Sequence, residues 1–468
     1  MLKSNIGARR GTNGGLRMIV GDLRARAGRS LADALAEALR EAVRDGRLPA
    51  GTPLPASRTL AADLQVSRGV VVRAYEQLVA EGYLRAHVGR GTVVGELPGV
   101  TAPAVPSTDR VLPASPGLPA LGMFPRREWL RALETALREV PDAELGYGDP
   151  RGHPRLRAAL AAYLGRTRAV VAAVDHIVVT SGFAQAIRLV AEALARHGID
   201  TVGVEEPGSV GVAETVRSAG LTTRPVPVDA DGVDVAALGD LRAVIVTPAH
   251  QFPTGAVLAP ARRTALLEWA ATGDGVVVED DYDAEYRYDR APVGALQGLA
   301  PERVVYGGSV SKTLAPGLRL GWVVAPPWLS PALVEAKFAA DIATPVLDQV
   351  ALAVLLETGA LDRHIRRTAS RYAARRQRLL AAVERHLPGW RATGIAAGLH
   401  AVLLPDRAPP PDVLAAAAAA ARPLLVTPLA AFARREPAPA GLVVGYGAAT
   451  PHQIDAGVAA AAAVLTRR

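Results

Sequence analysis

The sequence contains no cysteine, which excludes disulfide bridges and thiolate-ligated metal sites. It also lacks an uninterrupted apolar run long enough to span a bilayer, and residues 1–29 are basic and glycine-rich without the apolar segment of a signal peptide. We therefore expect a soluble, cytoplasmic protein with no membrane partner. The chain of 468 residues has room for several domains, and hydrophobic residues make up 50% of it, so a large core can be buried.

Positive charge is concentrated at the start of the chain. The first 100 residues contain 15 Lys and Arg against 9 Asp and Glu, an excess of six. That excess leaves only two units of the net charge of +8 for the remaining 368 residues. A local basic excess of this kind indicates a polyanion partner for the first fifth of the chain.

The basic region has the pattern of a small DNA-binding domain. Residues 1–29 are expected to be a flexible basic arm, and residues 30–96 combine helical periodicity with turns and a hairpin pattern. The expected elements are a helix from Leu31 to Val43, a short helix with Ser57 as its N-cap that runs to Leu64, a helix with Ser67 as its N-cap that ends before Gly82, and paired strands at 83–86 and 92–94. This order predicts a winged helix-turn-helix.

In such a domain the second helix of the pair enters the major groove of DNA by its N-terminal residues. The side chains then placed to contact DNA are Ser67, Arg68 and Arg73 on that helix, Arg58 on the helix before it, and Arg85, His87 and Arg90 on the wing. A small helical domain with a solvated basic face is the alternative that charge and periodicity leave open.

Beyond the basic region the composition changes twice. Residues 97–122 contain six prolines and little hydrophobic periodicity, which predicts an extended, partly rigid linker. Residues 123–468 alternate helical stretches with short apolar runs such as 177–179 and 243–246. Such alternation predicts right-handed βαβ units and a mostly parallel sheet, followed from about residue 360 by a smaller α+β lobe. Ligands bind such sheets outside the carboxyl ends of the strands.

One lysine lies at such a strand end. Lys312 follows the apolar run Val304–Tyr306, which is typical of a buried strand. A partly desolvated lysine amine has a lowered pKa and can attack a carbonyl, although a solvated loop lysine is the simpler alternative. Ser309, Ser311 and Arg319 flank the lysine with groups that bind phosphate. An aldehyde that carries a phosphate suits this set, and pyridoxal 5'-phosphate (PLP) is the obvious candidate.

Two further strand ends carry polar residues. The stretch Thr180–Gln185 opens a helix directly after a strand, so its backbone N–H groups form a seat for an anion. The stretch Asp280–Asp283 follows the run Val276–Val278. One of its aspartates can pair with a pyridinium nitrogen, and Tyr282 can donate to the phenolate oxygen of the cofactor. Helix capping and metal binding are alternatives, and the lack of a histidine nearby in the sequence disfavours metal.

Two sets of short motifs run along the chain. The first set is Leu54–Ala61, Val66–Arg68, Ala74–Leu78, Glu81–Leu84 and Gly89–Thr92. The second set is Tyr147–Gly152, Thr180–Gly182, Thr247–Gly255, Glu279–Asp283, Ser309–Thr313, Arg319–Gly321 and Gly398–His400. The first set resembles the winged helix of GntR-type transcription factors, and the second resembles fold-type I aminotransferases. The whole chain resembles the MocR (GabR-like) subfamily of GntR regulators.

The resemblance implies an α/β fold in which a fold-type I PLP-dependent transferase domain follows the winged helix-turn-helix. It implies an imine between Lys312 and PLP, a pyridinium partner at Asp280 and a phenol contact from Tyr282. Phosphate contacts are implied for Ser181, Gly182, Phe183, Ala184, Ser309, Ser311 and Arg319. The resemblance further implies a homodimer in which Tyr147 reaches the phosphate of the cofactor in the other subunit.

Three positions depart from the aminotransferase pattern. Ser209 stands where many relatives carry an aromatic that stacks on the pyridine ring, and Phe252 stands where aminotransferases carry an asparagine. Val443 stands where they carry the arginine that holds the substrate α-carboxylate. We therefore expect a regulator that binds a double-stranded DNA operator, senses PLP or a PLP-reactive amine or amino acid, and has little or no transaminase turnover. An active PLP-dependent aminotransferase with an appended DNA-binding module is the alternative.

Overall fold

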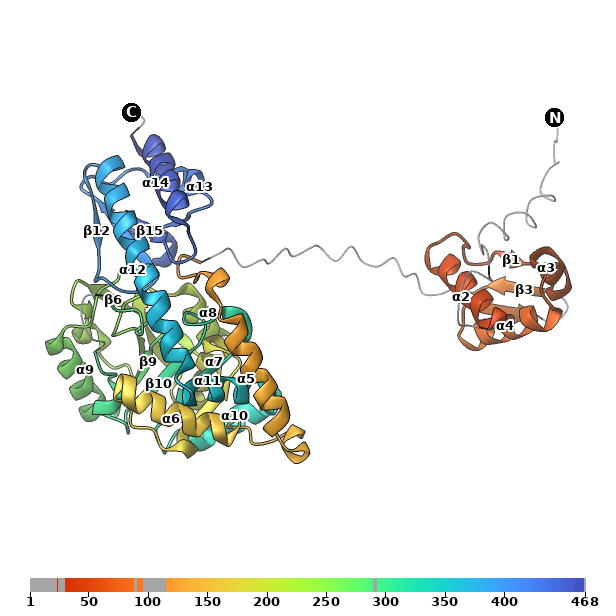
Figure 1. The fold of residues 1–468 in the computed structure, drawn as a ribbon, viewed down its shortest axis with the longest axis horizontal. Coiled ribbons are helices and arrows are strands. Elements are labelled where there is room, and N and C mark those ends of the chain that lie inside the picture. The colour runs from red at the N-terminus through yellow and green to blue at the C-terminus, as the bar shows by residue number, and fades with distance from the viewer. Residues whose placement is uncertain (1–22, 24–29, 88–90, 96–114, 289–292, 467–468) are drawn as a thin grey trace. The chain divides into compact units, whose positions relative to one another are not determined.

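The computed structural model describes residues 23, 30–87, 91–95, 115–288 and 293–466. The chain divides into two compact units, Met1–Val111 and Leu112–Arg468 (Figure 1). Residues 1–29, expected to be a basic arm, lie outside the described residues except for Leu23, which packs into the core of the first unit. None of the helices in the described ranges is long and apolar enough to cross a membrane.

The first unit is a helix-turn-helix with a two-stranded wing, as the sequence predicts. Its elements are α2 (Leu31–Arg44), β1 (Pro53–Leu54), α3 (Ser57–Leu64), α4 (Arg68–Ala80), β2 (Leu84–His87) and β3 (Gly91–Val94). The strands form an antiparallel sheet in the order β1-β3-β2. Aliphatic side chains such as Leu35, Leu60 and Leu78 are buried between the three helices.

The starts of the two paired helices differ in detail from the expectation. Ser57 is the first residue of α3, and Ala56 occupies the N-cap position without a side-chain hydrogen bond. Ser67 does occupy the N-cap position of α4, but its hydroxyl makes no capping hydrogen bond either. The Ser67 hydroxyl is therefore not used by the helix end.

The second unit is built on an eight-stranded sheet. Its strands are β4 (Ile177–Thr180), β5 (Thr201–Glu206), β6 (Thr222–Asp229), β7 (Gly232–Val233), β8 (Ala243–Val246), β9 (Val276–Asp280), β10 (Val304–Ser309) and β11 (Gly321–Val324). Their spatial order is β4-β11-β10-β9-β8-β5-β6-β7. Neighbours from β10 to β6 pair in parallel, whereas β11 and β7 run against their neighbours. The predicted mostly parallel sheet is confirmed.

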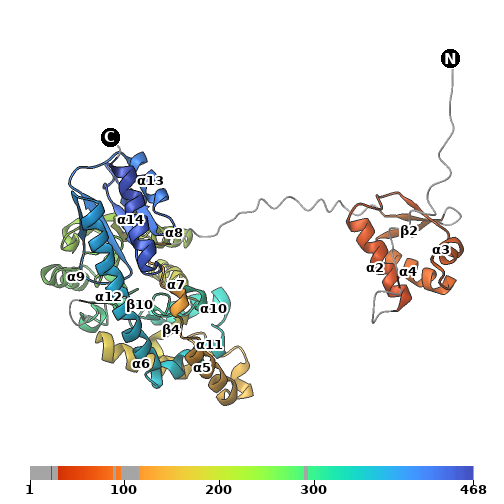
Figure 2. The same cartoon turned by 45° about the horizontal axis from the view of Figure 1, so that its top comes forward.

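Helices cover both faces of this sheet (Figures 1 and 2). They are α5 (Arg126–Glu139), α6 (Pro154–Arg168), α7 (Phe183–Arg196), α8 (Val210–Ser218), α9 (Pro260–Thr272), α10 (Ser330–Asp341) and α11 (Val346–Glu357). Val178 and Val305 pack in a core with α7 and α10, while Val179 and Tyr306 pack in a second core with α6 and α11. Strands buried on both faces explain the continuous apolar runs in the sequence.

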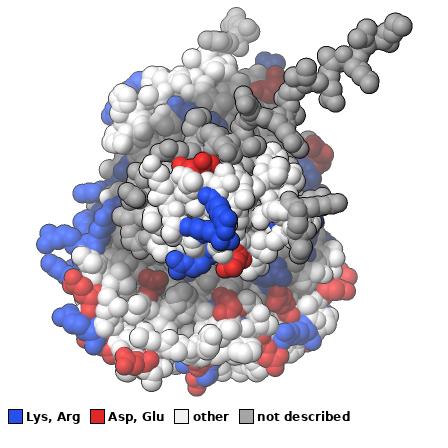
Figure 3. Space-filling view, turned by 90° about the vertical axis from the view of Figure 1, so that its right-hand side faces the viewer, with Lys and Arg blue, Asp and Glu red and all other residues white. Residues whose placement is uncertain are grey.

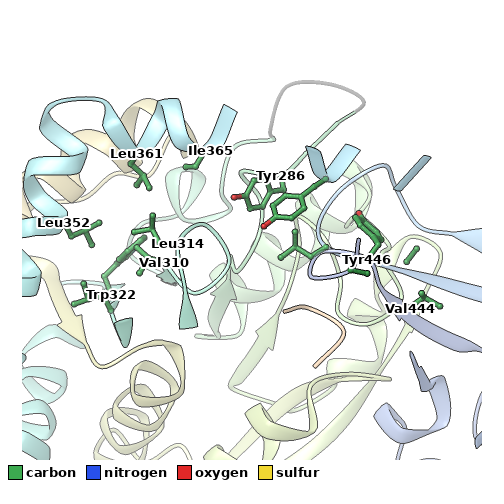
Figure 4. Packing of buried hydrophobic residues seen from close by; sticks show 14 of the residues in the cluster. Tyr286, Val310, Leu314, Trp322, Leu352, Leu361, Ile365, Val444 and Tyr446 are labelled. Carbon is green, nitrogen blue, oxygen red and sulfur yellow. The ribbon is translucent and has the colours of Figure 1, made fainter. Parts of the chain in front are cut away.

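The chain after α11 forms the expected smaller lobe. Its strands β12 (Trp390–Thr393), β13 (His400–Pro405), β14 (Leu425–Pro428) and β15 (Leu442–Gly445) form an antiparallel sheet in the order β12-β13-β15-β14. The helices of the lobe are α12 (Ala360–His386), α13 (Pro411–Ala420) and α14 (Pro451–Leu465). Tyr286, Val444 and Tyr446 belong to the same core as Trp322 of the large sheet, so the lobe and the sheet are packed together (Figure 4).

The end of the predicted linker is packed onto the second unit. The backbone N–H of Ala120 donates to the hydroxyl of Tyr372 at 3.1 Å. Pro116 lies against Gly445, where an added Cβ would clash with the Pro116 backbone oxygen. The stretch 115–122 therefore belongs to the large unit, because its backbone is held by that unit. The sequence placed the end of the proline-rich linker at residue 122, so the last residues of that predicted segment are the ones that pack on the large unit.

Candidate functional site

The candidate site forms where the carboxyl ends of neighbouring strands meet. In the sheet register, Thr180 of β4 is the partner of Gly321 in β11, and Gly321 is also the partner of Ser309 in β10. On the other side of β10, Gly307 is the partner of Asp280 in β9. The segments that follow Thr180, Asp280 and Ser309 therefore converge, although they lie far apart in the chain.

These segments line a cavity of about 260 Å³. The wall contains most of the cofactor-site residues that the sequence suggested, namely Phe183, Ala184, Asp280, Tyr282, Ser309, Ser311, Lys312 and Arg319. It also contains Ser115, Gly117, Val204, Glu205, Ser209, Val212, Ile245, Thr247 and Phe252. The structure thus brings the three strand ends around one space.

Lys312 sits on a short loop that is anchored in the core on both sides. Val310 and Leu314, two residues before and after it, are buried among Trp322 and Leu361 (Figure 4). Because its neighbours are fixed in this way, the side chain of Lys312 is held at the cavity wall.

Burial makes the Lys312 amine easier to deprotonate than a solvated lysine. Burial lowers the pKa of the Lys312 amine, and the nearby carboxyl groups of Asp283 and Asp280 oppose that shift. Nζ donates a hydrogen bond to the backbone oxygen of Gly117 at 2.8 Å. A lysine with a lowered pKa and only a neutral partner is suited to attack a carbonyl carbon.

Asp280 offers an unpaired oxygen. It lines the cavity, and its Oδ1 is buried without a hydrogen-bond partner among the residues that the structure describes. Burial raises the pKa of Asp280 well above the usual range, Asp281 and Glu205 raise it further, and Lys312 lowers it. An unsatisfied buried acceptor costs about 1–3 kcal/mol, so a cation or an N–H donor from a ligand is its natural complement.

The adjacent carboxylate has a structural role. Asp281 accepts hydrogen bonds from Nε and Nη2 of Arg168 at 2.7 and 3.0 Å and from the hydroxyl of Tyr306 at 2.6 Å. All three side chains are buried. Asp281 is therefore fully engaged in the core, and of the two consecutive aspartates only Asp280 is available to a ligand in the cavity.

Asp283 controls the tautomer of His250. Nδ1 of His250 lies 2.9 Å from Oδ2 of Asp283 and 3.1 Å from the hydroxyl oxygen of Tyr282. A carboxylate can only accept, so Nδ1 carries a proton and donates it to Asp283. A protonated Nδ1 has no lone pair to accept another hydrogen bond. The hydroxyl proton of Tyr282 is therefore free to be donated into the cavity that Tyr282 lines.

Arg319 and the turn after β4 form an anion-binding corner. Nη2 of Arg319 donates to the backbone oxygen of Ser181 at 2.6 Å. A Cβ added at Gly182 would lie 2.7 Å from the Arg319 guanidinium, and the φ of 82° at this residue also requires glycine. Helix α7 begins at Phe183, and the first N–H groups of a helix have no partner within it. The guanidinium of Arg319 and the start of α7 therefore lie side by side and offer donors for one anion.

Glu205 is a wall residue to which the sequence assigned no role. Its carboxylate accepts hydrogen bonds from the backbone of Thr247 and from Nε2 of Gln251, each at 3.1 Å. Burial raises the pKa of Glu205 to about 7. Glu205 could have been predicted from its place near the end of β5. Ligands bind at the carboxyl ends of parallel strands, and that rule selected Asp280 at the end of β9.

The three departures from the aminotransferase pattern have structural roles here. The Ser209 hydroxyl accepts from the backbone N–H of Val212 at 3.4 Å and caps α8. The ring of Phe252 packs edge-to-face against Tyr282 with ring centroids 6.2 Å apart. Val443 is completely buried in an apolar cluster with Val402.

A cluster with metal-ligand composition lies next to the cavity. His250, Asp283 and His400 are buried with possible ligand atoms within 4.8 Å of one another. Both histidines come from distant parts of the chain. The lack of a histidine close to Asp283 in the sequence therefore does not by itself disfavour a metal site. Nε2 of His400 donates to the oxygen of Pro253 at 3.1 Å, and burial holds the pKa of His400 well below its usual value. The existing hydrogen bonds account for His250 and Asp283 without a cation.

Two groups of suggested residues lie on the surface. Tyr147 is 81% exposed and is absent from the wall of this cavity. In the first unit, the exposed residues include Arg58, Ser67, Arg68, Arg73, Arg85 and His87, whereas Arg90 lies outside the described residues. Figure 3 shows a small group of Lys and Arg side chains at the centre of the surface turned to the viewer, with acidic side chains above and below it, and side chains of both charges scattered around the rest of the view.

The cavity fits PLP by the chemistry of its walls. The Lys312 amine suits an aldehyde, and the orphaned oxygen of Asp280 suits a pyridinium N–H. The hydroxyl proton of Tyr282 suits a phenolate oxygen, and the corner at Arg319 suits a phosphate.

Comparison with known families agrees with this geometry. The model of the family "Aminotransferase class I and II" matches residues 125–435. The model of the family "Bacterial regulatory proteins, gntR family" matches residues 31–94. Class I and II aminotransferases depend on PLP, which is therefore the cofactor of this kind of domain.

Two regulators are similar to most of the chain. The probable rhizopine catabolism regulatory protein MocR of Rhizobium meliloti is 37% identical over 372 residues, which are 74% of this chain and 75% of that protein. The HTH-type pyridoxine biosynthesis transcriptional regulator PdxR of Corynebacterium glutamicum is 35% identical over 413 residues, 86% of this chain and 88% of that protein.

Solved aminotransferases share the fold of the second unit. LysN, an α-aminoadipate aminotransferase of Thermus thermophilus complexed with N-(5'-phosphopyridoxyl)-L-leucine, has a TM-score of 0.66 and 29% identity. The match covers 75% of this chain and 90% of that one. A Pyrococcus horikoshii kynurenine aminotransferase in complex with PMP has a TM-score of 0.67 and 28% identity, and covers 75% and 89%.

Proposed function

This chain belongs to the class I and II aminotransferase family and carries a gntR-family domain at its start, and from that premise we propose that it is a transcription regulator whose aminotransferase-like domain senses PLP or a PLP-reactive amine. The observation that carries the proposal is the orphaned oxygen of Asp280 in the same cavity as the Lys312 amine. Since such regulators act on the chromosome, we place the protein in the cytoplasm.

Each part of PLP has a complement in the cavity. The Lys312 amine would hold the aldehyde carbon, and Asp280 would hold the protonated ring nitrogen. The phosphate would be held by Ser181, Gly182, Phe183, Ala184, Ser309, Ser311 and Arg319. When bound, PLP supplies an aldehyde that captures amines and a ring that withdraws electrons from them.

The residues of the chain set the position of two protons. Asp280 holds a proton on the ring nitrogen, because an ionised Asp280 is stable in this buried site only beside a cation. Tyr282 donates its hydroxyl proton to the phenolate oxygen, since the pair of His250 and Asp283 leaves that proton uncommitted.

The winged helix supplies the operator contacts. Arg68 and Arg73 on α4 and Ser67 at its N-cap face the major groove, where the Ser67 hydroxyl, which does not cap the helix, binds a phosphate or a base edge. Arg58 on α3 contacts the phosphate backbone. Arg85, His87 and Arg90 contact it from the wing.

The protein acts as a homodimer in this proposal. Helix α5 packs on α11, yet Leu130 and Leu137 are 57% and 66% exposed. These leucines are seven residues apart and lie on one face of α5, and exposed apolar rows of this kind mark interaction surfaces. Tyr147, shortly after α5, then reaches the phosphate of the cofactor bound by the other subunit.

The relatives support two classes of effector. The name of the Corynebacterium protein describes a regulator of pyridoxine biosynthesis, which favours PLP itself as the signal. The name of the Rhizobium protein describes a regulator of rhizopine catabolism, which favours a small organic effector. Both classes can act through the PLP aldehyde. PLP as the signal reacts with Lys312, and an amine effector competes with Lys312 for the same aldehyde.

An active aminotransferase is the second candidate. The family match and the complete set of PLP complements favour it. Against it stands Val443, an apolar residue buried in a cluster, at the position that the resemblance assigns to the carboxylate-binding arginine. A substrate held without that ion pair loses the orientation that transamination needs, so we favour the regulator.

The test measures operator binding and cofactor bonding on the same protein. The full chain is titrated with DNA from its own upstream region, with and without PLP, while the near-visible absorbance of the Lys312 adduct is recorded. A change in DNA affinity that follows the absorbance supports the proposal. DNA binding that is insensitive to a fully formed adduct, and to amines added afterwards, refutes the sensing function.

A further inference from the structure

We propose that the backbone of residues 115–118 is part of the cofactor site and senses whether Lys312 is bonded to the cofactor. The contact that carries this is the hydrogen bond of 2.8 Å from Nζ of Lys312 to the oxygen of Gly117. The approach is close, since a Cβ added at Gly117 would lie 3.0 Å from that nitrogen. The inference rests on the proposed function, because it assumes that PLP bonds to Lys312.

The segment is shaped and seated by the small lobe. The N–H of Leu118 donates to the oxygen of Ser115 at 2.9 Å, which forms a turn with Gly117 inside it. On the lobe, a Cβ at Gly445 would clash with the oxygen of Pro116, and one at Gly447 would lie 2.8 Å from the oxygen of Leu118. Two glycines at the end of β15 thus let the turn lie directly on the lobe.

Bonding at Lys312 removes the donor of this hydrogen bond. The neutral amine attacks the aldehyde carbon, the two amine protons leave with the carbonyl oxygen as water, and the nitrogen forms a double bond to that carbon. A proton that later returns to the nitrogen is attracted to the phenolate oxygen of the cofactor. The oxygen of Gly117 then loses its partner, so the turn at 115–118 is held less firmly.

An amine effector reverses this change. When an amine takes the place of Lys312 on the aldehyde carbon, Lys312 regains two protons and is again able to donate to Gly117. The turn is therefore secured when Lys312 is free and released when Lys312 is bonded. Because residues 115–118 directly follow the sequence that leads from the winged helix, the chemical state of Lys312 is passed to the connection between the two units.

Pyridoxamine 5'-phosphate distinguishes a covalent bond at Lys312 from mere filling of the cavity. It has the ring and phosphate of PLP but an amine in place of the aldehyde, so it fills the cavity and leaves Lys312 free. The experiment compares amide hydrogen exchange over residues 115–122 of the full chain with each compound. We expect about five- to tenfold faster exchange at Leu118 and Ala120 with PLP, as for the loss of one hydrogen bond. Operator affinity is expected to differ between the two compounds as well.

Two glycine variants provide a matched control. Gly117→Ala crowds Nζ of Lys312, whereas Gly122→Ala meets nothing within 4 Å. Gly117→Ala should reduce the difference between the two compounds, and Gly122→Ala should preserve it. Lys312→Ala should abolish the difference, because neither compound can then bond to the chain.

The outcomes distinguish this inference from the proposed function. An adduct that borohydride traps, together with equal exchange for the two compounds, overturns the coupling and leaves PLP binding intact. Failure to form any adduct at Lys312 overturns both. Faster exchange with PLP that also persists in Lys312→Ala assigns the effect to the aldehyde itself and refutes the role of Lys312.

Discussion

Oδ2 of Asp283 lies 2.9 Å from Nδ1 of His250, and both side chains are almost completely buried. This pair keeps the Nδ1 proton directed at Asp283, so the neighbouring Tyr282 hydroxyl cannot donate to His250. The hydrogen bond therefore determines where the phenolic proton of Tyr282 goes, although neither Asp283 nor His250 lines the cavity.

Asp283→Asn should raise the pKa of the PLP chromophore. Without the carboxylate, His250 can adopt the other tautomer and accept the Tyr282 proton, so the phenolate oxygen loses a donor and holds the chromophore proton more tightly. We expect an increase of about one unit, measured by spectrophotometric pH titration. Tyr282→Phe should give a similar shift, and the double variant should add little.

The other groups that face Tyr282 remain in that variant. These groups are Asp280, Glu205 and Tyr446, which raise the pKa of Tyr282 by their charge, as Asp283 does in the wild type. Loss of a negative charge alone would lower the chromophore pKa, because a carboxylate favours the protonated form. The direction of the shift therefore decides between the two effects, and a decrease would contradict the tautomer argument.

Lys312→Ala should abolish the covalent bond to the cofactor. The wild-type protein is expected to be yellow and to retain a reduced cofactor after borohydride treatment, because the Lys312 amine lies in the cavity with a lowered pKa. The variant should lose both properties. Lys3→Ala serves as the control, and intact mass spectrometry detects the adduct. An adduct of the same yield in Lys312→Ala would assign the bond to another amine.

Asp280→Asn should stabilise the cofactor-free protein while weakening PLP binding. Burial raises the folded pKa of Asp280, so folding loses stability as the pH rises above the unfolded pKa and towards the folded one. An asparagine at position 280 does not ionise, so the variant does not lose this stability as the pH rises. The melting temperature of the variant relative to wild type should therefore increase between pH 5 and pH 7 by a few degrees, since about 1 kcal/mol corresponds to roughly 2–4 °C.

The effect should reverse with the cofactor. In the presence of PLP the wild type gains from the pairing of Asp280 with the ring nitrogen, and the variant does not. Melting curves with and without PLP check both parts. A variant that is less stable than wild type at pH 7 without cofactor would mean that Asp280 is satisfied in the folded protein.

Arg68→Ala and Arg73→Ala should each weaken operator binding by about tenfold or more and leave PLP bonding unchanged. Both side chains are exposed on α4, and each charged contact with DNA contributes about 1–3 kcal/mol. Arg407→Ala removes an exposed arginine from the second unit and is the charge-matched control. If all three variants bind the operator with equal affinity, the DNA-binding surface is not on α4.

Transaminase turnover should be negligible. Loss of a charge-assisted pair on the substrate carboxylate costs about 1.5–3 kcal/mol, and the loss of orientation adds to it. Val443 supplies no such pair, since it is buried among apolar side chains. The assay follows glutamate formation over hours from PLP, a panel of amino acids and 2-oxoglutarate. Multiple turnovers per site with any amino acid would favour the enzyme over the regulator.

Local pattern was sufficient for most of the fold. The apolar runs at 177–179, 243–246 and 276–278 became β4, β8 and β9, because strands with two buried faces leave continuous apolar sequence. The same pattern predicted that Lys312 and Asp280 lie at the carboxyl ends of strands, and Asp280 is the last residue of β9. The boundary of the linker was less accessible, because proline content does not reveal that residues 115–122 are held by hydrogen bonds and close packing on the large unit.

The sequence by itself determined that the chain has a winged helix, a mostly parallel sheet and polar groups at the carboxyl ends of its strands. Only the tertiary structure decided which of the aspartates is free. Asp281 is engaged by Arg168, Asp283 by His250, and Asp280 retains an unpaired oxygen. The physical reason is that periodicity fixes only the direction of a side chain from its strand, whereas its partners come from segments that lie far away in the sequence.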